Sequence, residues 1–294
     1  MSAAVEASEA TSKERYQNAP RRADHTIDQA WTTYSAAEHD RWDRLFARSQ
    51  SILDGRACDE FIAMMHALKL SESGIPDMAK LSDRLDRITG WRVVPVAGLV
   101  PDDVFFNHLA NRRFPAGAFI RAEHEMDYLE EPDIFHDVFG HVPMLMNPVI
   151  ADFVQAYGVG GLRASRLGAL EQLARVYWFT IEFGLVRQHG ALRIYGSGIV
   201  SSHGETRFAL VDDSPNRIAF DLLRVMRTRY RIDDFQQTYF VVDSLDALLQ
   251  LAHIDFAPLY GRVRGLPELQ PDDVVAEDIV VSHGTGRHHR RGRP

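Results

Sequence analysis

The chain has 294 residues, of which 45% are hydrophobic and 25% charged, a composition that excludes collagenous, disordered and disulfide-stapled proteins. Its single cysteine, Cys58, excludes an internal disulfide and a cysteine-based zinc or iron–sulfur site, and it favours a reducing compartment, so we expect a cytoplasmic protein. The formal net charge of −8 argues against general nucleic-acid binding. The 13 histidines stand out, because histidine is the commonest metal ligand.

We expect neither a signal peptide nor a membrane helix. Glu6 and Glu9 lie where a signal peptide would have its apolar stretch, and no apolar run approaches the roughly 20 residues of a membrane helix. Residues 1–24 are small, polar and aperiodic, which predicts a flexible N-terminal segment.

The other end of the chain has a basic tail. Residues 271–294 are expected to be flexible, and the last twelve, HGTGRHHRRGRP, contain four Arg and three His but no acidic residue. Such a tail could bind a metal or a polyanion, but a solvated terminus is the favoured interpretation. Residues 25–270 between the two ends are expected to form one catalytic domain.

Helical periodicity dominates this domain. In chain order we predict helices at 36–54, 57–69 and 75–88, a short or edge strand at 91–98, a helix at 101–112, and deep helices at 147–157 and 166–188. Strands are then predicted at 192–202 and 206–213, a helix at 216–230, a strand at 239–244 and a helix at 245–254. The predicted fold class is therefore mostly α with a small β component (α+β), without the βαβ alternation of nucleotide-binding folds. The glycine-rich stretch 157–161 is expected between two helices and lacks the preceding strand of a dinucleotide-binding motif.

The segment EPDIFHDVFGHVP, residues 131–143, is the densest candidate for chemistry. His136 and His141 lie about 140° apart on an ideal α-helix, so they would not share a face. We expect Gly140 to end the helix with a positive φ, and Pro143 to help turn the chain, which could bring the two imidazoles together. In such apolar surroundings, a metal site is favoured over a pair of hydrogen-bonded core histidines.

Glu182 is the candidate for a third ligand. Trp178 and Phe179 precede it by one turn and Leu185 and Val186 follow it, so its carboxylate would be costly to bury unless it is paired or coordinated. A salt bridge to a distant arginine is the alternative. Two His and one Glu favour a facial triad that binds Fe(II), although zinc accepts the same ligands.

These segments carry a resemblance to a known family. EPDIFHDVFGHVP, YWFTIEFGL, YGSGIVSS, PVAGLV and ACDEF stand in the order and spacing of the pterin-dependent aromatic amino acid hydroxylases, over roughly residues 30–260. The resemblance implies His136, His141 and Glu182 as iron ligands. It also implies tetrahydrobiopterin or a related tetrahydropterin as electron donor, O2 as co-substrate, and L-phenylalanine as the substrate converted to L-tyrosine.

The resemblance assigns further residues to the substrate. Arg121 matches the arginine that binds the substrate α-carboxylate, and Asp133 would orient its guanidinium. Three positions match the surroundings of the substrate ring, and one serine matches the floor of the pocket. They are Pro132, Trp178, Phe183 and Ser201.

A second set of positions is implied for the pterin. Phe105 would stack on the pterin ring, and backbone groups of Val100 and Asp102 would hydrogen-bond to it, in a loop that begins at Gly98. Asp137 stands where animal members of the family have a glutamate.

Other functions remain open from the sequence. A zinc hydrolase would need an acid or base beside the metal, for which Asp137 is the only near candidate. A non-catalytic metal- or pterin-binding module is supported only by the His- and Arg-rich tail. Within the family, tyrosine or tryptophan is the alternative substrate. The partners we expect are small molecules alone, and we expect a monomer, because the C-terminal tail has no heptad pattern.

Overall fold

The computed structural model describes residues 11–291 except for 71, 128 and 130. Five α-helices belong to its N-terminal part: α1 (Ser12–Gln17), α2 (Ala36–Leu53), α3 (Asp59–Ala67), α4 (Met78–Thr89) and α5 (Asp102–Ala110). Short 3₁₀ turns occur at η1 (Trp31–Thr33), η2 (Glu123–Glu125) and η4 (Pro143–Met146), and two π-helical segments at η3 (Phe135–His141) and η5 (Trp178–Glu182).

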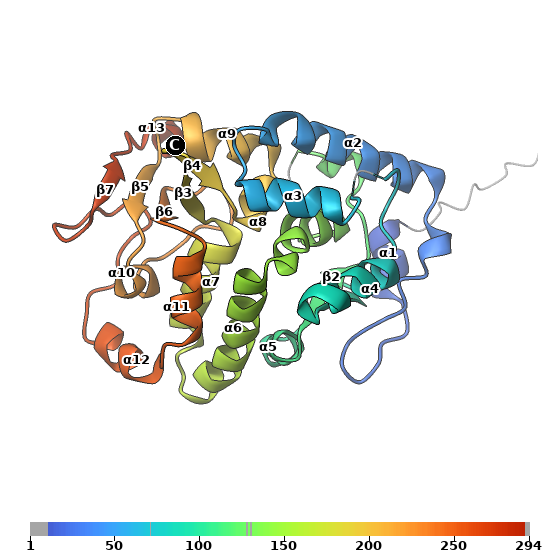
Figure 1. Cartoon of the computed structure of the whole chain (residues 1–294), viewed down its shortest axis with the longest axis horizontal. Helices are drawn as coiled ribbons and strands as arrows, with labels where there is room; N and C mark the ends of the chain where they lie inside the picture. The colour runs from blue at the N-terminus through green and yellow to red at the C-terminus, as the bar shows by residue number, and fades with distance from the viewer. Residues whose placement is uncertain (1–10, 71, 128, 130, 292–294) are drawn as a thin grey trace, which may run out of the picture.

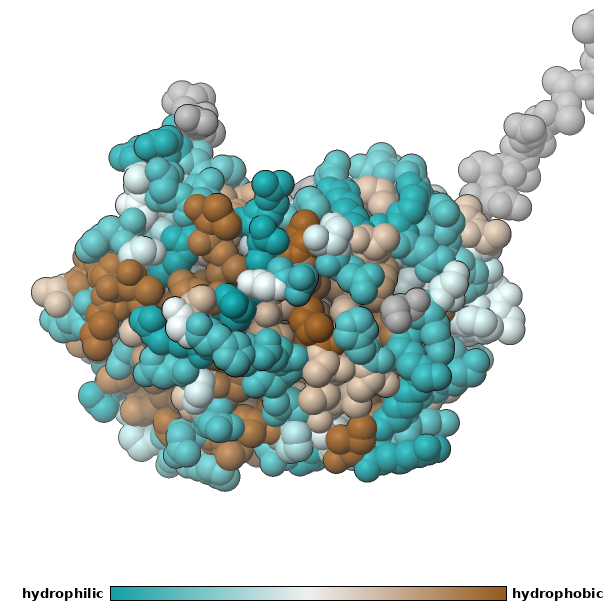
Figure 2. Space-filling view, turned by 45° about the horizontal axis from the view of Figure 1, so that its top comes forward, coloured by the Kyte–Doolittle hydropathy of each residue, from teal (hydrophilic) through white to brown (hydrophobic). Residues whose placement is uncertain are grey.

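The remaining helices begin with the long α6 (Pro148–Arg166), which runs through the middle of the molecule (Figure 1). They continue with α7 (Leu170–Tyr177), α8 (Ser197–Val200), α9 (His203–Val211), α10 (Leu222–Met226), α11 (Asp246–Ala252), α12 (Ala257–Arg264) and α13 (Arg287–Arg291). None of the helices in the described part of the chain is long and apolar enough to cross a membrane. On the face shown in Figure 2, apolar residues form separate groups among polar ones.

Two small sheets lie at opposite ends of the molecule (Figure 1). In one, β1 (Arg92–Val96) and β2 (Arg113–Gly117) are parallel and α5 connects them. The other has the order β4-β3-β6-β5-β7, formed by β3 (Leu185–Gln188), β4 (Ala191–Ile194), β5 (Asn216–Ala219), β6 (Thr238–Val242) and β7 (Val280–Ser282). Its β3, β6 and β5 are parallel, and both edge strands are antiparallel to their neighbours. The expected fold class, mostly α with a small β component, is confirmed.

Most predicted elements up to residue 112 are confirmed, as are the strand at 239–244 and the helix at 245–254. Three predictions in the C-terminal half are wrong. Residues 206–211 lie in helix α9 instead of a strand, because the Ser202 hydroxyl accepts from the Glu205 N–H and caps this helix. The helix predicted at 216–230 is strand β5 followed by α10, since β5 pairs with β6 and β7 on its two sides. The strand predicted at 192–202 ends at Ile194, and α8 follows it.

The two deep helices also differ from the prediction. The helix predicted at 166–188 ends at η5 and gives way to β3, and Gly184 makes this break possible, because a Cβ there would lie 2.2 Å from the Tyr195 ring. The helix predicted at 147–157 continues to Arg166, so the glycines at 157–161 lie inside it and not between helices. Gly158 and Gly161 are required there, because a Cβ at either would overlap α5.

The two ends expected to be flexible contain some regular structure among their described residues: α1 at the N-terminal end, and β7 and α13 at the C-terminal end. In α1, the Thr11 side chain caps the helix, and Tyr16 is buried with its hydroxyl on the Gln29 carbonyl. At the other end, β7 adds an edge strand to the sheet, and the Gly284 N–H donates to Asn216 Oδ1. These long-range contacts follow no local sequence pattern. Residues 1–10 and 292–294 lie outside the described residues.

Gly140 has a different role from the one expected. It does not have a positive φ and does not end the helix; it lies within η3. A Cβ on Gly140 would lie 2.8 Å from the Ser197 carbonyl oxygen and 3.2 Å from Ser197 Cβ. The glycine is therefore required by the close approach of α8 to η3.

We predict that Gly140→Ala destabilises the protein by about 1–3 kcal/mol, because backbone atoms of α8 must move away from η3. Urea unfolding measures this. Gly261→Ala is the matched control, since a Cβ at Gly261 in α12 meets nothing within 4 Å, and it should be neutral or stabilising. Equal unfolding free energies for the two variants would contradict the packing role of Gly140.

Candidate active site

The three predicted metal ligands converge in the structure. His141 Nε2 lies 3.1 Å from Glu182 Oε1, His136 Nε2 lies 3.7 Å from Glu182 Oε2, and the two Nε2 atoms are 3.3 Å apart. All three side chains are at most one-fifth exposed. They form the arrangement of two imidazoles and one carboxylate that a divalent metal requires.

Two π-helical segments place these ligands. In a π-helix each N–H bonds to the carbonyl five residues earlier, so residues five apart lie nearly above one another. His136 and His141 have this spacing within η3, so both imidazoles are on one side of the segment without the chain reversal that we expected. In η5, the Phe183 N–H donates to the Trp178 carbonyl, also five residues earlier, and Glu182 lies in this turn.

Two serines around α8 orient the ligands. The Ser201 hydroxyl donates to the Ser197 carbonyl over 2.7 Å, so it accepts from His136 Nδ1–H over 3.0 Å. This fixes the tautomer of His136 and leaves the Nε2 lone pair free to bind a metal. The Ser197 hydroxyl lies 2.9 Å from Glu182 Oε2 and 3.0 Å from the Ile181 carbonyl oxygen, between which its proton is shared.

The pKa values favour the metal-binding forms of two ligands. Burial lowers the pKa of His136 to about 4 and so keeps its ring neutral at pH 7, although Glu182 opposes the shift. Burial alone would raise the pKa of Glu182, but His141, His136 and the Ser197 hydroxyl together lower it to about 2. Glu182 also raises the pKa of His141 in spite of burial, so a metal competes with a proton for this imidazole.

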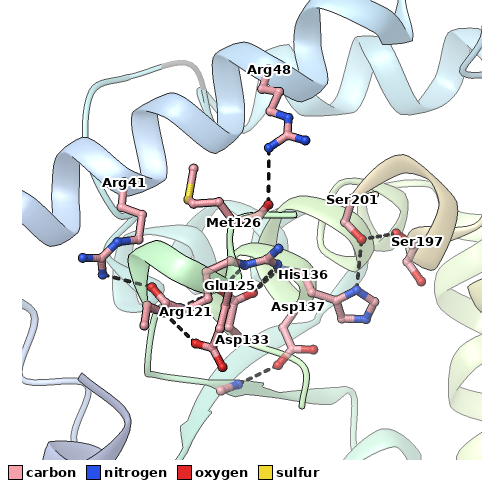
Figure 3. A network of polar contacts seen from close by, with 12 residues as sticks. Arg41, Arg48, Arg121, Glu125, Met126, Asp133, His136, Asp137, Ser197 and Ser201 are labelled. Atoms are coloured by element: carbon pink, nitrogen blue, oxygen red, sulfur yellow. Dashed lines mark hydrogen bonds and ion pairs between the residues drawn. The ribbon is translucent and has the colours of Figure 1, made fainter. Parts of the chain in front are cut away.

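Asp133 connects the predicted carboxylate-binding arginine to the metal site (Figure 3). Its side chain is completely buried and accepts from Arg121 Nε and Nη2, both at 2.8 Å. The same carboxylate accepts from the His136 backbone N–H at 3.0 Å. Burial would raise the pKa of Asp133, but Arg121 and the two backbone N–H donors outweigh it and lower the pKa. Arg121 Nη1 makes no hydrogen bond to the described residues, so it is available to a ligand.

The aromatic residues assigned to the substrate ring lie together. The rings of Trp178 and Phe183 are 4.8 Å apart, and Tyr230 stacks on Trp178 at 4.2 Å. The Trp178 indole N–H donates to Gln236 Oε1 over 2.9 Å, which fixes the orientation of this ring.

A cavity of about 200 Å³ joins the metal ligands to the predicted pterin loop. The three ligands line it together with five residues of the expected substrate and pterin sets. These are Gly98, Val100, Phe105, Pro132 and Asp137. Asp102 does not line it; it is exposed at the first residue of α5. Burial raises the pKa of Asp137 to about 7, and its Oδ2 accepts from the Gly117 N–H over 2.7 Å.

Sequence reasoning missed several residues of this site. Ser197 was not predicted as a site residue, and neither was Gln236, which reaches Trp178 across 58 positions of sequence. The cavity is also lined by Phe114 and Tyr177, which look like ordinary core residues in the sequence.

The chain matches a model of the biopterin-dependent aromatic amino acid hydroxylases over residues 13–257. It belongs to this family. The expectations of the fold, the family and a pterin-dependent enzyme are thereby confirmed.

Other hydroxylases of this family are similar over nearly the whole chain. The phenylalanine-4-hydroxylase of Caulobacter vibrioides is 59% identical over 271 residues, which cover 92% of both chains. An iron- and phenylalanine-bound crystal structure of phenylalanine hydroxylase from Chromobacterium violaceum superposes with a TM-score of 0.87 at 47% identity, and the match covers 92% of this chain and all of that one. A cobalt-bound structure of the same enzyme gives a TM-score of 0.89 at 48% identity, with 92% of this chain and 99% of that chain covered.

We predict that Ser201→Ala weakens metal binding to this hydroxylase by roughly 10- to 100-fold, because His136 loses the acceptor that fixes its tautomer. Anaerobic titration with Fe(II) measures the affinity. Ser49→Ala removes a similarly buried serine from α2, which carries none of the ligands, and should leave the affinity unchanged. An unaltered Fe(II) affinity in Ser201→Ala would contradict the orienting role.

Proposed function

We propose that this hydroxylase converts L-phenylalanine to L-tyrosine with O2 and a tetrahydropterin, at iron bound by His136, His141 and Glu182. The proposal rests on one observation: two imidazoles and one carboxylate converge at the wall of a single cavity. Phenylalanine as the substrate is supported by relatives named phenylalanine-4-hydroxylase at up to 59% identity. Iron is supported by the iron-bound relative.

The donor set fits iron. Nitrogen, nitrogen and oxygen ligands on one side of the ion leave other coordination positions open, as in non-haem Fe(II) oxygenases. When bound there, iron supplies the activation of O2. The protein side chains have the remaining tasks: they hold the ligands in their binding forms, position the substrate and exclude water.

Arg121 is proposed to bind the substrate carboxylate. Asp133 occupies Nε and Nη2, which fixes the guanidinium plane and leaves Nη1 for the incoming anion. The carboxylate of Asp133 also accepts from the His136 N–H. This one buried group therefore positions both the arginine proposed to bind the substrate and a residue proposed to bind the metal. Trp178, Phe183 and Pro132 are proposed to contact the substrate ring, and Ser201 acts through His136.

The pterin is proposed to lie in the part of the cavity lined by Gly98, Val100 and Phe105. The ring of Phe105 packs edge-on against the ring of Tyr177, with the two centroids 6.2 Å apart. This contact helps to fix the orientation of the Phe105 ring. Asp137 lines the same cavity, and with a pKa raised by burial to about 7 its carboxyl group can hold a proton at neutral pH. Asp102 is proposed to contribute only through its backbone.

We propose further that the protein acts as a monomer in the cytoplasm, on small molecules alone, without nucleic-acid or membrane partners. The reducing compartment is supported by Cys58, which is buried and has a pKa raised by burial to about 12. The proposed domain organisation is a catalytic unit over 25–270, which the described end segments pack against.

Product analysis tests the proposed activity. The Fe(II)-loaded chain should form tyrosine from phenylalanine only when both O2 and a tetrahydropterin are present, and Glu182→Ala should neither retain iron nor turn over. Tyrosine and tryptophan, assayed in parallel, should be poorer substrates. Hydrolytic activity with zinc in the absence of O2, or tyrosine formation without pterin, would contradict the proposal.

We predict that Arg121→Lys raises the KM for phenylalanine roughly 30-fold, or about 2 kcal/mol, with a smaller change in kcat, because lysine lacks the planar fork. Iron content should stay at the wild-type level. Inhibition by 2-phenylethylamine, which has the ring but no carboxylate, is the control and should not change. An unchanged KM would contradict the carboxylate contact.

A further inference from the structure

A second cluster of two histidines and one carboxylate lies at the C-terminal end, outside the cavity of the candidate active site. His288 and His289 are consecutive residues of α13, and Asp234 precedes β6. Like the three iron ligands, these residues offer ligand atoms that all lie within 4.8 Å of one another.

The geometry of this cluster is nearly that of the candidate iron site. Asp234 Oδ1 lies 3.0 Å from His288 Nε2, and Oδ2 lies 3.8 Å from His289 Nε2. The corresponding distances from Glu182 are 3.1 Å and 3.7 Å. The imidazole centroids are 4.9 Å apart at 79° in the tail cluster, and 5.1 Å apart at 78° in the iron ligands. The tail cluster therefore has the same types of donor atom, at nearly the same separations, as the candidate iron site.

The backbone holds this arrangement independently of the imidazoles. Ahead of α13, the Thr285 N–H donates to the Asp213 carbonyl and the Gly286 N–H to the Ser214 carbonyl. The His288 N–H then donates to the Ser214 hydroxyl over 2.9 Å. The cluster is preorganised, so a metal would not have to order a free chain end.

The surroundings favour a coordinated ion over a simple surface ion pair. His289 is 7% exposed, and the ring of Phe208 contacts both imidazoles. The His289 Nε2–H donates to the Phe235 carbonyl over 2.7 Å, and Nδ1 has no hydrogen-bond partner among the described residues. When the ring proton lies on Nδ1 instead, Nε2 is free to bind a metal, and the carbonyl oxygen is close enough to be a fourth donor.

Two of the neighbouring arginines are already paired with carboxylates. Arg287 contacts Asp213, and Arg231 forms two hydrogen bonds with Asp233. Asp234 forms no salt bridge with a Lys or Arg among the described residues; its carboxylate contacts the two histidines, and its Oδ1 also accepts from the Phe235 backbone N–H over 2.8 Å. One carboxylate and two imidazoles are thus left for a cation.

We propose that Asp234, His288 and His289 form a second metal site, which takes a divalent first-row transition ion such as Zn²⁺. Imidazole and carboxylate donors suit this class of ion better than Mg²⁺ or Ca²⁺, which prefer oxygen alone. The ion joins the C-terminal helix to the segment before β6. That segment also carries Gln236, the residue that orients Trp178.

Zinc titration of the metal-free full chain, followed by calorimetry, tests the proposal. The wild type should bind two equivalents, and Asp234→Asn and His288→Ala should each bind one. His288 is exposed, and asparagine has nearly the shape of aspartate, so neither substitution should prevent folding. His283→Ala is the matched control, because His283 is another exposed tail histidine outside the cluster, and it should keep both equivalents.

The two sites fail independently. Glu182→Ala should lose one equivalent and keep the one assigned to the tail, whether or not the chain hydroxylates phenylalanine. A single equivalent in the wild type, a second equivalent that survives His288→Ala, or one that His283→Ala also removes would overturn the second site.

Discussion

The catalytic arrangement depends on burying three polar side chains in an apolar interior while keeping them aimed at one point. Two π-helical turns do this: η3 places His136 and His141 above one another, and η5 presents Glu182 opposite them. An isolated carboxylate in such surroundings would cost several kcal/mol, so each ligand needs a partner. Ser197 of α8 and Ser201, which follows this helix, are the partners of Glu182 and His136. Helix α8 can approach only because residue 140 has no side chain.

A single buried residue, Asp133, links the proposed metal and substrate sites. Asp133 accepts from both the Arg121 guanidinium and the His136 backbone, so the group proposed to bind the amino acid and the group proposed to bind iron share one rigid neighbour. Figure 3 shows a further layer, in which Arg41 of α2 donates to the Arg121 carbonyl. The cavity then places the predicted pterin loop beside the ligands. Phe105, Phe114 and Tyr177 contribute aromatic side chains to its wall. Excluding water from such a site strengthens the electrostatic interactions inside it.

Candidate site residues were predicted from the sequence more accurately than the secondary-structure elements that carry them. The buried polar residues and the family resemblance predicted His136, His141 and Glu182 as ligands, and the structure brings these three together. The π-helical turn was not predicted, since no rule of α-helical periodicity produces it. Strand β5 was predicted as helix because its partners β6 and β7 lie far away in sequence. Helix α9 could have been recognised from its Ser202–Glu205 cap. Gln236 and the packing of the tail depend on long-range contacts that a single sequence does not reveal.

A crystal structure of the anaerobically Fe(II)-loaded chain, with anomalous data collected at the iron edge, tests the central claim most directly. The account predicts iron bonded to Nε2 of His136, Nε2 of His141 and the carboxylate of Glu182, with the Ser201 hydroxyl still on His136 Nδ1. Open coordination positions should face the cavity lined by Phe105 and Asp137. Iron bound through Nδ1 of His136, or at residues other than these three, would contradict it.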